Sequence, residues 1–273
     1  MAKHGERHAI LCPACGKLVS AEAEVCIHCG YSRPGKLGFH SVVRRLGGRG
    51  VRAVPMLVAL CVVLYVVSLL LDLRAVAQPH GVTGLLAPSM RSLARLGMTG
   101  AAALFAGRWW TLITAIYLHG NLLHLLFNVL WIRQLGPAVE ELFGTPRLLL
   151  IFTLSGAAGM LFSGLLGVGF TIGASGAIFG LMGALISYGR MHGGLMGSLL
   201  SRQLLLWAVV LLAMGFLMPG VNNVAHLVGF ASGFLLAQLL GYGERRGSSL
   251  RLQLAAAATA TLTLLCFVLA LLA

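Results

Sequence analysis

The chain has 273 residues, of which 58% are hydrophobic and 10% are charged. An average soluble domain carries about 25% charged residues, so this composition excludes an ordinary soluble globular protein and favours a protein of the lipid bilayer. The net charge of +13 does not indicate nucleic-acid binding, because the Lys and Arg residues lie mostly between apolar runs, as in a polytopic membrane protein.

Four cysteines near the N-terminus form a pattern typical of a zinc site. Cys12, Cys15, Cys26 and Cys29 make two CxxC pairs, each followed by glycine. Two intervening residues let both thiolates of a pair face one tetrahedral ion, and the glycine relieves the tight turn. We therefore predict that residues 1–32 form a zinc ribbon, in which four thiolates hold a structural Zn²⁺. Disulfides are disfavoured, because the orientation derived below places this segment in the reducing cytoplasm.

A basic linker and seven apolar segments follow the cysteines. The linker at 33–52 is expected at a membrane surface of anionic lipid. Charged residues and Gly- or Pro-rich interruptions set the limits of the apolar segments. The predicted spans are about 53–71, 112–135, 148–166, 175–190, 203–218, 224–241 and 252–273. The fold class is therefore an all-α polytopic membrane protein.

The distribution of Lys and Arg predicts the orientation of the chain. With a cytoplasmic N-terminus, the inner segments carry sixteen of the 20 cations and the outer segments carry four. Positively charged segments stay on the cytoplasmic side, so the N-terminus is predicted to be inside. A long polar stretch precedes the first apolar run, which is therefore expected to be a span and not a cleavable signal peptide.

Polar residues within the predicted spans gather at one depth. They are His119, His124 and Asn128 in the second span, Ser175 at the start of the fourth, and His226 at the start of the sixth. Even-numbered spans run from the outside inward in this orientation, which places all five near the outer leaflet. Polar groups are costly in lipid, so their clustering indicates a functional site.

The acidic residues lie outside the interiors of the spans. This argues against an aspartyl intramembrane protease, a zinc protease with a His-Glu-x-x-His motif and a carboxylate-based transporter. Serine–histidine chemistry remains, in which histidine accepts the serine proton and later gives it to the leaving amine. Glycine stripes on the fourth and sixth spans permit close approach of the two helices. We therefore expect a dyad of Ser175 and His226, with no acidic third member.

Each polar residue also has a structural interpretation. A serine at a glycine-rich helix start commonly caps the helix, and a histidine there can simply bond a carbonyl. These interpretations weaken when taken together, because all of them would have to hold at a single depth.

Four segments resemble the motifs of the rhomboid intramembrane serine proteases. Residues 173–176 (Gly-Ala-Ser-Gly) are similar to the family's GxSG motif, and residues 225–233 are similar to its AHxxGxxxG motif. Residues 119–128 resemble its helix-two signature, and residues 136–144 resemble its GxxxExxxG segment. The resemblance covers about residues 109–241.

This resemblance implies a core of six helices at 53–243, with an additional C-terminal helix at 252–273. It implies an intramembrane serine endopeptidase that cuts single-span membrane proteins near the outer leaflet and needs no catalytic cofactor. Ser175 is then the nucleophile and His226 the base. The Ser175 N–H, His124 and Asn128 would form the oxyanion site, supported by Gly173, Phe179 and His119.

Two positions depart from the family pattern. The Trp-Arg pair of the family's first outer loop corresponds to Trp110-Thr111, and the position one turn after the serine, often Tyr, is Phe179. A Phe ring can still stack under the His226 ring, although it offers no hydroxyl.

The expected location is a bacterial inner membrane. The expected partners are single-span membrane proteins, the lipid bilayer and a cytoplasmic protein bound by the zinc ribbon. The alternative function is that of a catalytically silent rhomboid relative that binds or escorts membrane clients, although such relatives usually lack the serine or the histidine. A transporter would be expected to have duplicated halves, and the sequence contains no internal repeat.

Overall fold

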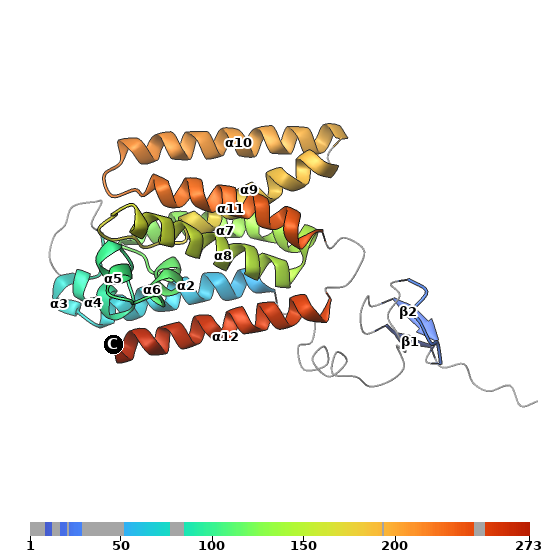
Figure 1. Ribbon diagram of the computed structural model, residues 1–273, viewed down its shortest axis with the longest axis horizontal. Coiled ribbons are helices and arrows are strands. Elements are labelled where there is room, and N and C mark those ends of the chain that lie inside the picture. The colour runs from blue at the N-terminus through green and yellow to red at the C-terminus, as the bar shows by residue number, and fades with distance from the viewer. Residues whose placement is uncertain are drawn as a thin grey trace, which may run out of the picture.

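The computed structural model describes residues 9–12, 17–20, 22–28, 52–76, 85–192, 194–242 and 249–273. Most of them form a bundle of long helices (Figure 1). These helices are α2 (Ala53–Leu70), α7 (Leu122–Phe143), α8 (Thr145–Leu165), α9 (Ser175–His192), α10 (Gly194–Leu217), α11 (Asn223–Leu240) and α12 (Leu250–Leu272).

Short helices cluster at one end of the bundle, between α2 and α7 (Figure 1). They are α3 (Leu73–Val76), α4 (Met90–Arg95), α5 (Ala101–Phe105), α6 (Thr111–Thr114) and the 3₁₀ helix η2 (Ala115–Tyr117). This end also holds the starts of α9 and α11. The loop before α9 pairs with the loop before α5 through Thr171 and Thr99, and Asn222, which precedes α11, donates to the Thr171 hydroxyl.

Among the described residues, six helices are long and apolar enough to cross a membrane, namely α2, α7, α8, α10, α11 and α12. Helix α9, the predicted fourth of seven spans, is not among them. It lies at the centre of the bundle against α7, α8, α10 and α11, and most of its residues are buried. A helix enclosed by other helices does not have to match the lipid, so its composition is less apolar. The seventh crossing stays a prediction.

Two helix starts differ from the predicted limits by more than three residues. The second span was expected at about 112–135, whereas α7 begins at Leu122 and residues 111–117 form α6 and η2. The Asn121 side chain caps α7 by accepting a hydrogen bond of 2.7 Å from the N–H of His124, which fixes the helix start. Helix α10 begins at Gly194 rather than 203, because it continues past the charged residue Arg202.

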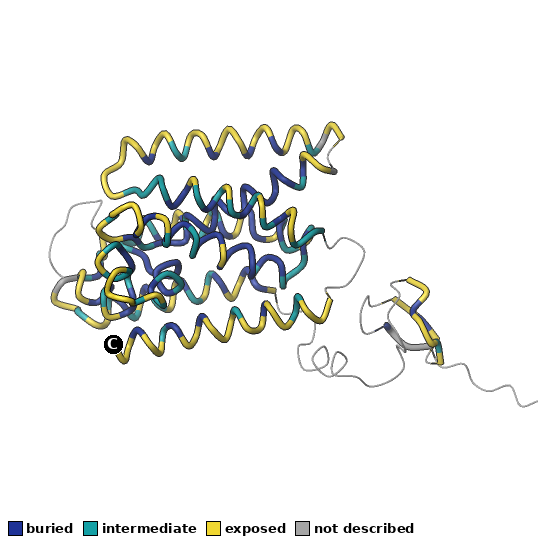
Figure 2. The backbone as a smooth tube through the Cα atoms, in the orientation of Figure 1, coloured by how far each residue is buried: buried dark blue, intermediate teal, exposed yellow. Residues whose placement is uncertain are grey.

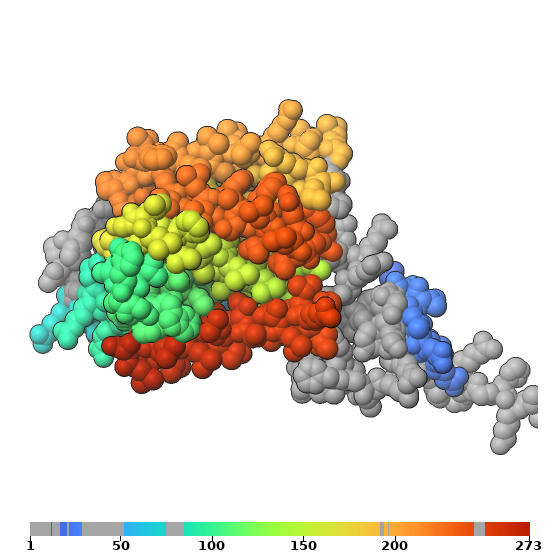
Figure 3. Space-filling model, in the orientation of Figure 1, coloured from blue at the N-terminus to red at the C-terminus, as the bar shows by residue number. Residues whose placement is uncertain are grey.

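Burial separates the central helices from the outer ones. Figure 2 shows dark blue concentrated on the central helices, while α10 and α12 are largely yellow. In the space-filling view (Figure 3), α10 runs along the upper edge and α12 along the lower edge. Their exposed large apolar side chains, such as Leu206 on α10 and Leu264 on α12, are suited to contact with lipid.

Two charged side chains cap helix ends at the end of the bundle away from Ser175. Glu140 on α7 accepts hydrogen bonds from the N–H of Ala53, at 2.7 Å, and from the hydroxyl of Thr145, at 2.9 Å. Arg147 on α8 donates to the carbonyls of Phe143, at 3.1 Å, and Leu240, at 2.9 Å. These backbone groups lie at helix ends, where no intrahelical partner is available.

The N-terminal residues contain an antiparallel pair of strands, β1 (Ala9–Leu11) and β2 (Leu18–Ser20). The N–H of Cys12 donates to the carbonyl of Lys17 at 2.8 Å, which closes the connection between the strands. Cys12 and Cys26 are both buried. The other two predicted zinc ligands, Cys15 and Cys29, lie outside the described residues.

Candidate active site

Glycines bring α9 and α11 into backbone contact. A Cβ atom on Gly229 would collide with the carbonyl oxygen of Gly176, and one on Gly233 would collide with that of Gly180. The close approach predicted from the glycine stripes is therefore confirmed. It places the starts of the two helices side by side, because small residues at a helix interface let the backbones touch.

This contact joins Ser175 at the start of α9 to His226 in the first turn of α11. Nε2 of His226 lies 2.8 Å from Oγ of Ser175, a normal hydrogen-bond length for a hydroxyl donor. The His226 ring stacks on Phe179, with 4.4 Å between ring centroids and 10° between ring planes. The histidine is buried and the serine is half-buried. The structure thus brings the predicted pair together, while its catalytic role stays a prediction.

His124 lies beside the turn that leads to Ser175. The N–H of Gly120 donates to Nδ1 of His124 at 3.4 Å, so in the neutral ring Nε2 carries the hydrogen. That Nε2 faces Gly173, where a Cβ atom would come within 2.6 Å of it. Gly173 has φ +115°, a conformation that favours glycine. His124 therefore offers a donor next to the nucleophile turn.

Asn128 and His119 lie on either side of His124 in the sequence. Asn128 is buried and donates from Nδ2 to the carbonyl of His124 at 2.8 Å; within the described part of the chain its Oδ1 has no hydrogen-bond partner. His119 is fully buried. Its Nδ1 donates to the carbonyl of Tyr117 at 3.2 Å, and its ring packs edge-on against His124 at 5.1 Å. His119 therefore supports His124 by packing.

Threonines anchor the loop before Ser175. The N–H of Thr171 donates to the carbonyl of Thr99 at 2.8 Å, and the hydroxyls of Thr99 and the buried Thr111 share a hydrogen bond of 3.0 Å. Asn222 donates to the Thr171 hydroxyl at 2.9 Å. Thr111 stands at the position predicted to replace the family's arginine, and these hydrogen bonds hold the segment between α2 and α7 to the loop before Ser175.

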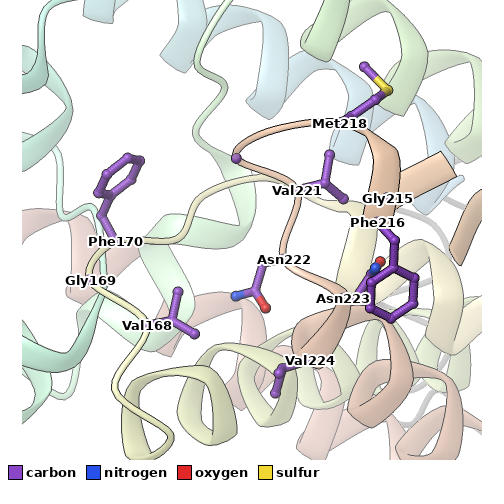
Figure 4. Close-up of a pocket in the computed structure, with 11 residues that line it drawn as sticks. Val168, Gly169, Phe170, Gly215, Phe216, Met218, Val221, Asn222, Asn223 and Val224 are labelled. Atoms are coloured by element: carbon purple, nitrogen blue, oxygen red, sulfur yellow. The ribbon is translucent and has the colours of Figure 1, made fainter. Parts of the chain in front are cut away.

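A cavity of about 570 Å³ opens beside the start of α11. Its walls come from residues 168–170 of the loop before α9, the end of α10 around Phe216, and residues 220–224. Figure 4 shows Asn222 and Asn223 between these walls. The cavity thus opens between the loop before α9, the end of α10 and the start of α11.

One polar neighbour of His226 was not predicted from the sequence. Oδ1 of Asn223 lies 3.3 Å from Nδ1 of His226, on the ring edge opposite Ser175. The sequence predicts a dyad without an acidic third member, and this group is an uncharged carboxamide. An asparagine three residues before the histidine on one helix is the signal that could have found it, because residues three apart are neighbours on a helix surface.

The apolar helices and the buried polar cluster define the class: a multi-pass integral membrane protein built around a Ser–His site. Residues 106–243, about half of the chain, match the family model described as the Rhomboid domain. The chain belongs to the rhomboid family.

Curated relatives agree with this assignment. The chain is 33% identical over 150 residues to Rhomboid protease GluP of Bacillus subtilis (strain 168), which covers 55% of this chain and 30% of that protein. It is 37% identical over 174 residues to RHOMBOID-like protein 5 of Arabidopsis thaliana, covering 60% and 54%. For the rhomboid relative YdcA of Bacillus subtilis the identity is 37% over 140 residues, covering 49% and 68%. The chain spans about half, or less, of the length of the first two relatives.

Proposed function

We propose that this protein is an intramembrane serine endopeptidase that cleaves transmembrane segments of single-span membrane proteins near the outer leaflet. The observation that carries the proposal is the 2.8 Å contact between Ser175 Oγ and His226 Nε2, made between two helices inside an apolar bundle. Membership of the rhomboid family and the relative named as a protease support this activity.

In the proposed reaction, Ser175 attacks the carbonyl carbon of a substrate peptide bond. His226 accepts the hydroxyl proton at Nε2 and then delivers it to the leaving amine, as a general base and then a general acid. The C–N bond breaks and an ester to Ser175 Oγ remains. Water, deprotonated by the same histidine, hydrolyses this ester and restores the serine.

The developing oxyanion needs donors beside Ser175. The serine's own N–H and the Nε2–H of His124 are the first candidates, because His124 faces the turn at Gly173. Asn128 is the third, since one Nδ2 hydrogen is bound to the His124 carbonyl and the other is available. One such donor typically stabilises the transition state by about 2.7–4 kcal/mol.

Water and substrate both need access to the half-buried Ser175. The cavity at the start of α11 is lined by Asn222 and Asn223, close in sequence to His226, and would hold water at this end of the bundle; irregular backbone at membrane depth is tolerated where it lines such a space. An intact substrate helix hides its carbonyls in hydrogen bonds. We therefore expect cleavage at small side chains near helix-weakening residues.

The topology and the N-terminal domain are part of the proposal. We infer seven crossings from the apolar segments and a cytoplasmic N-terminus from the distribution of Lys and Arg, and we propose a bacterial inner-membrane location. Cys12, Cys15, Cys26 and Cys29 would hold a structural Zn²⁺. The burial of Cys12 and Cys26 fits such a site, and thiolate sulfur is a preferred zinc ligand.

Metal analysis of the purified full-length chain tests the zinc site. Stoichiometric zinc is expected in the wild type, and substitution Cys12→Ser should lower it while cleavage in detergent continues. A wild-type chain without bound zinc, or a Cys12→Ser variant with undiminished zinc, would contradict this assignment. The ribbon is also the part proposed to bind a cytoplasmic partner.

Two substitutions test the peptidase function. Ser175→Ala and His226→Ala should each abolish cleavage of a model transmembrane substrate in proteoliposomes, with expression unchanged. A fluorophosphonate should label the wild type and not Ser175→Ala. Ser187→Ala is the matched control, because Ser187 is buried on the same helix and its hydroxyl has no hydrogen-bond partner in the described chain. This control should cleave normally.

Two outcomes would contradict the proposal. Undiminished cleavage by Ser175→Ala or His226→Ala would exclude the dyad. A wild-type protein that neither cleaves nor labels, although folded, would favour the alternative of a silent relative that binds or escorts membrane clients.

A further inference from the structure

A carboxamide holds the side of the His226 ring that faces away from Ser175. Asn223 is the first residue of α11, and its Oδ1 lies 3.3 Å from Nδ1 of His226. Nε2 of the same ring lies 2.8 Å from Oγ of Ser175. Both ring nitrogens are therefore engaged, while Phe179 stacks on the face of the ring.

Helix α10 determines which way the carboxamide points. Nδ2 of Asn223 lies 3.2 Å from the carbonyl oxygen of Leu212 on α10. A backbone carbonyl only accepts hydrogen bonds, so the NH₂ group must face Leu212 and the amide oxygen must face His226. The orientation of the amide thus follows from the hydrogen-bond network.

The orientation of the amide in turn determines the tautomer of His226. An amide oxygen only accepts, so the bond between Oδ1 and the ring requires a hydrogen on Nδ1. In the neutral ring, Nε2 then has a free lone pair. This lone pair is directed at the Ser175 hydroxyl, which is the arrangement that a general base needs.

The packing of α10 leaves room for this amide at Gly215. A Cβ atom at this position would collide with Oδ1 of Asn223 and lie 3.0 Å from its Cγ. Helix α10 packs mainly on α9 and has few contacts with α11. The hydrogen bond of Asn223 is one of these few contacts. Figure 4 shows Asn223 next to Phe216, at the end of α10.

We propose that Asn223 is a positioning residue that keeps His226 in the tautomer able to accept the serine proton. The inference rests on the proposed peptidase function. When Ser175 attacks, its proton moves to Nε2, and the imidazolium keeps its Nδ1–H bond to the amide oxygen. Asn223 itself takes no proton. An uncharged amide suits this place, because an unpaired carboxylate is costly in an apolar environment.

The substitution Asn223→Leu removes the acceptor and keeps a similar side-chain shape. We expect kcat to fall by roughly tenfold to a hundredfold, the usual loss when the partner of a functional histidine is removed, with KM nearly unchanged. The rate of fluorophosphonate labelling should fall in parallel, whereas the final labelled fraction should equal that of the wild type. A purely structural role would instead lower the final fraction.

Three further variants sharpen the experiment. Asn223→Asp restores an acceptor for Nδ1–H and should recover part of the kcat lost in Asn223→Leu. Gly215→Ala displaces the amide from the α10 side and should give an intermediate loss. Gln238→Leu removes an amide from an exposed position of the same helix and should leave kcat unchanged.

The outcomes separate this inference from the proposed function. A wild type that labels and cleaves, with Asn223→Leu labelling at the same rate, would overturn the positioning role alone. The same conclusion would follow if Asn223→Asp were no better than Asn223→Leu. A folded wild type that neither labels nor cleaves would overturn the peptidase function and this inference with it.

Discussion

The two sides of α11 are built in opposite ways. On the α9 side, Gly229 and Gly233 touch the backbone carbonyls of Gly176 and Gly180, and no side chain separates the helices there. On the α10 side, the helix start borders an open cavity of about 570 Å³, and Asn223 donates a hydrogen bond to a carbonyl of α10. On the α9 side the two backbones therefore pack directly on each other, whereas on the α10 side the contacts of α11 are few and polar.

This difference matches two separate requirements of the proposed chemistry. The distance between a nucleophile and its base must be fixed, and backbone contact between helices fixes it more firmly than contact between long side chains. Water and an extended peptide must also reach the pair, which requires one loosely packed side. A hydrolase in lipid therefore benefits from asymmetry around the helix that carries the histidine.

The largest expected effect comes from disrupting the backbone contact between α9 and α11. In Gly233→Ala the new Cβ meets the backbone of Gly180, so the helices must move apart and Ser175 must separate from His226. We expect cleavage to be lost and the free energy of unfolding to fall by about 1–3 kcal/mol, a typical cost of overpacking. Thermal unfolding and cleavage in the same detergent measure both effects.

The control for this variant is Ala231→Val, which adds bulk to an exposed position of the same helix and should preserve cleavage. Alanine favours a helix over glycine by about 1 kcal/mol. Propensity alone would therefore make Gly233→Ala more stable, and a more stable, active variant would refute the close contact.

A smaller effect is expected at the turn before the serine. In Gly173→Ala the Cβ would press on Nε2 of His124, and we expect kcat to fall by about 10²–10³, the usual loss of one oxyanion donor. Gly167→Ala is the matched control, because Gly167 also has a positive φ, of +82°, but nothing lies within 4 Å of its Cβ position. Both variants incur backbone strain of about 1–3 kcal/mol. Equal kcat values in the two variants would contradict a role for His124.

These contrasts also explain what the sequence could and could not predict. The approach of Ser175 to His226 could be predicted, because glycine spacing on two helices is a local pattern with a direct packing consequence. The role of Asn223 could not be predicted, because the direction of its amide depends on the carbonyl of Leu212. The position of Leu212 on α10 relative to α11 is set by tertiary packing, which the sequence does not reveal. The start of α7 at Leu122 was missed, since apolar composition continues through the short helices before it.

Helix α9 and the predicted zinc ribbon show two further limits of what can be predicted from the sequence. The apolar segments were predicted as seven equivalent spans, yet α9 is enclosed by α7, α8, α10 and α11, and which segments pack around it is determined by tertiary structure. The cysteine spacing predicts a metal site from chemistry alone. Cys12 and Cys26 are buried, which fits that prediction without identifying a ligand.

The smallest effect is expected from loosening α10. Trp207 on this helix meets Trp131 on α7 edge-on, with 5.8 Å between ring centroids, and such a pair contributes about 0.5–1.5 kcal/mol beyond its buried area. Trp207→Ala should lower stability by a similar amount and leave the rate of fluorophosphonate labelling nearly unchanged. Trp109→Ala, which removes another partly exposed tryptophan, is the control. If Trp207→Ala abolished labelling as Gly233→Ala should, the serine and the histidine would depend on α10 as much as on α9, and the asymmetry of α11 would not be what holds them.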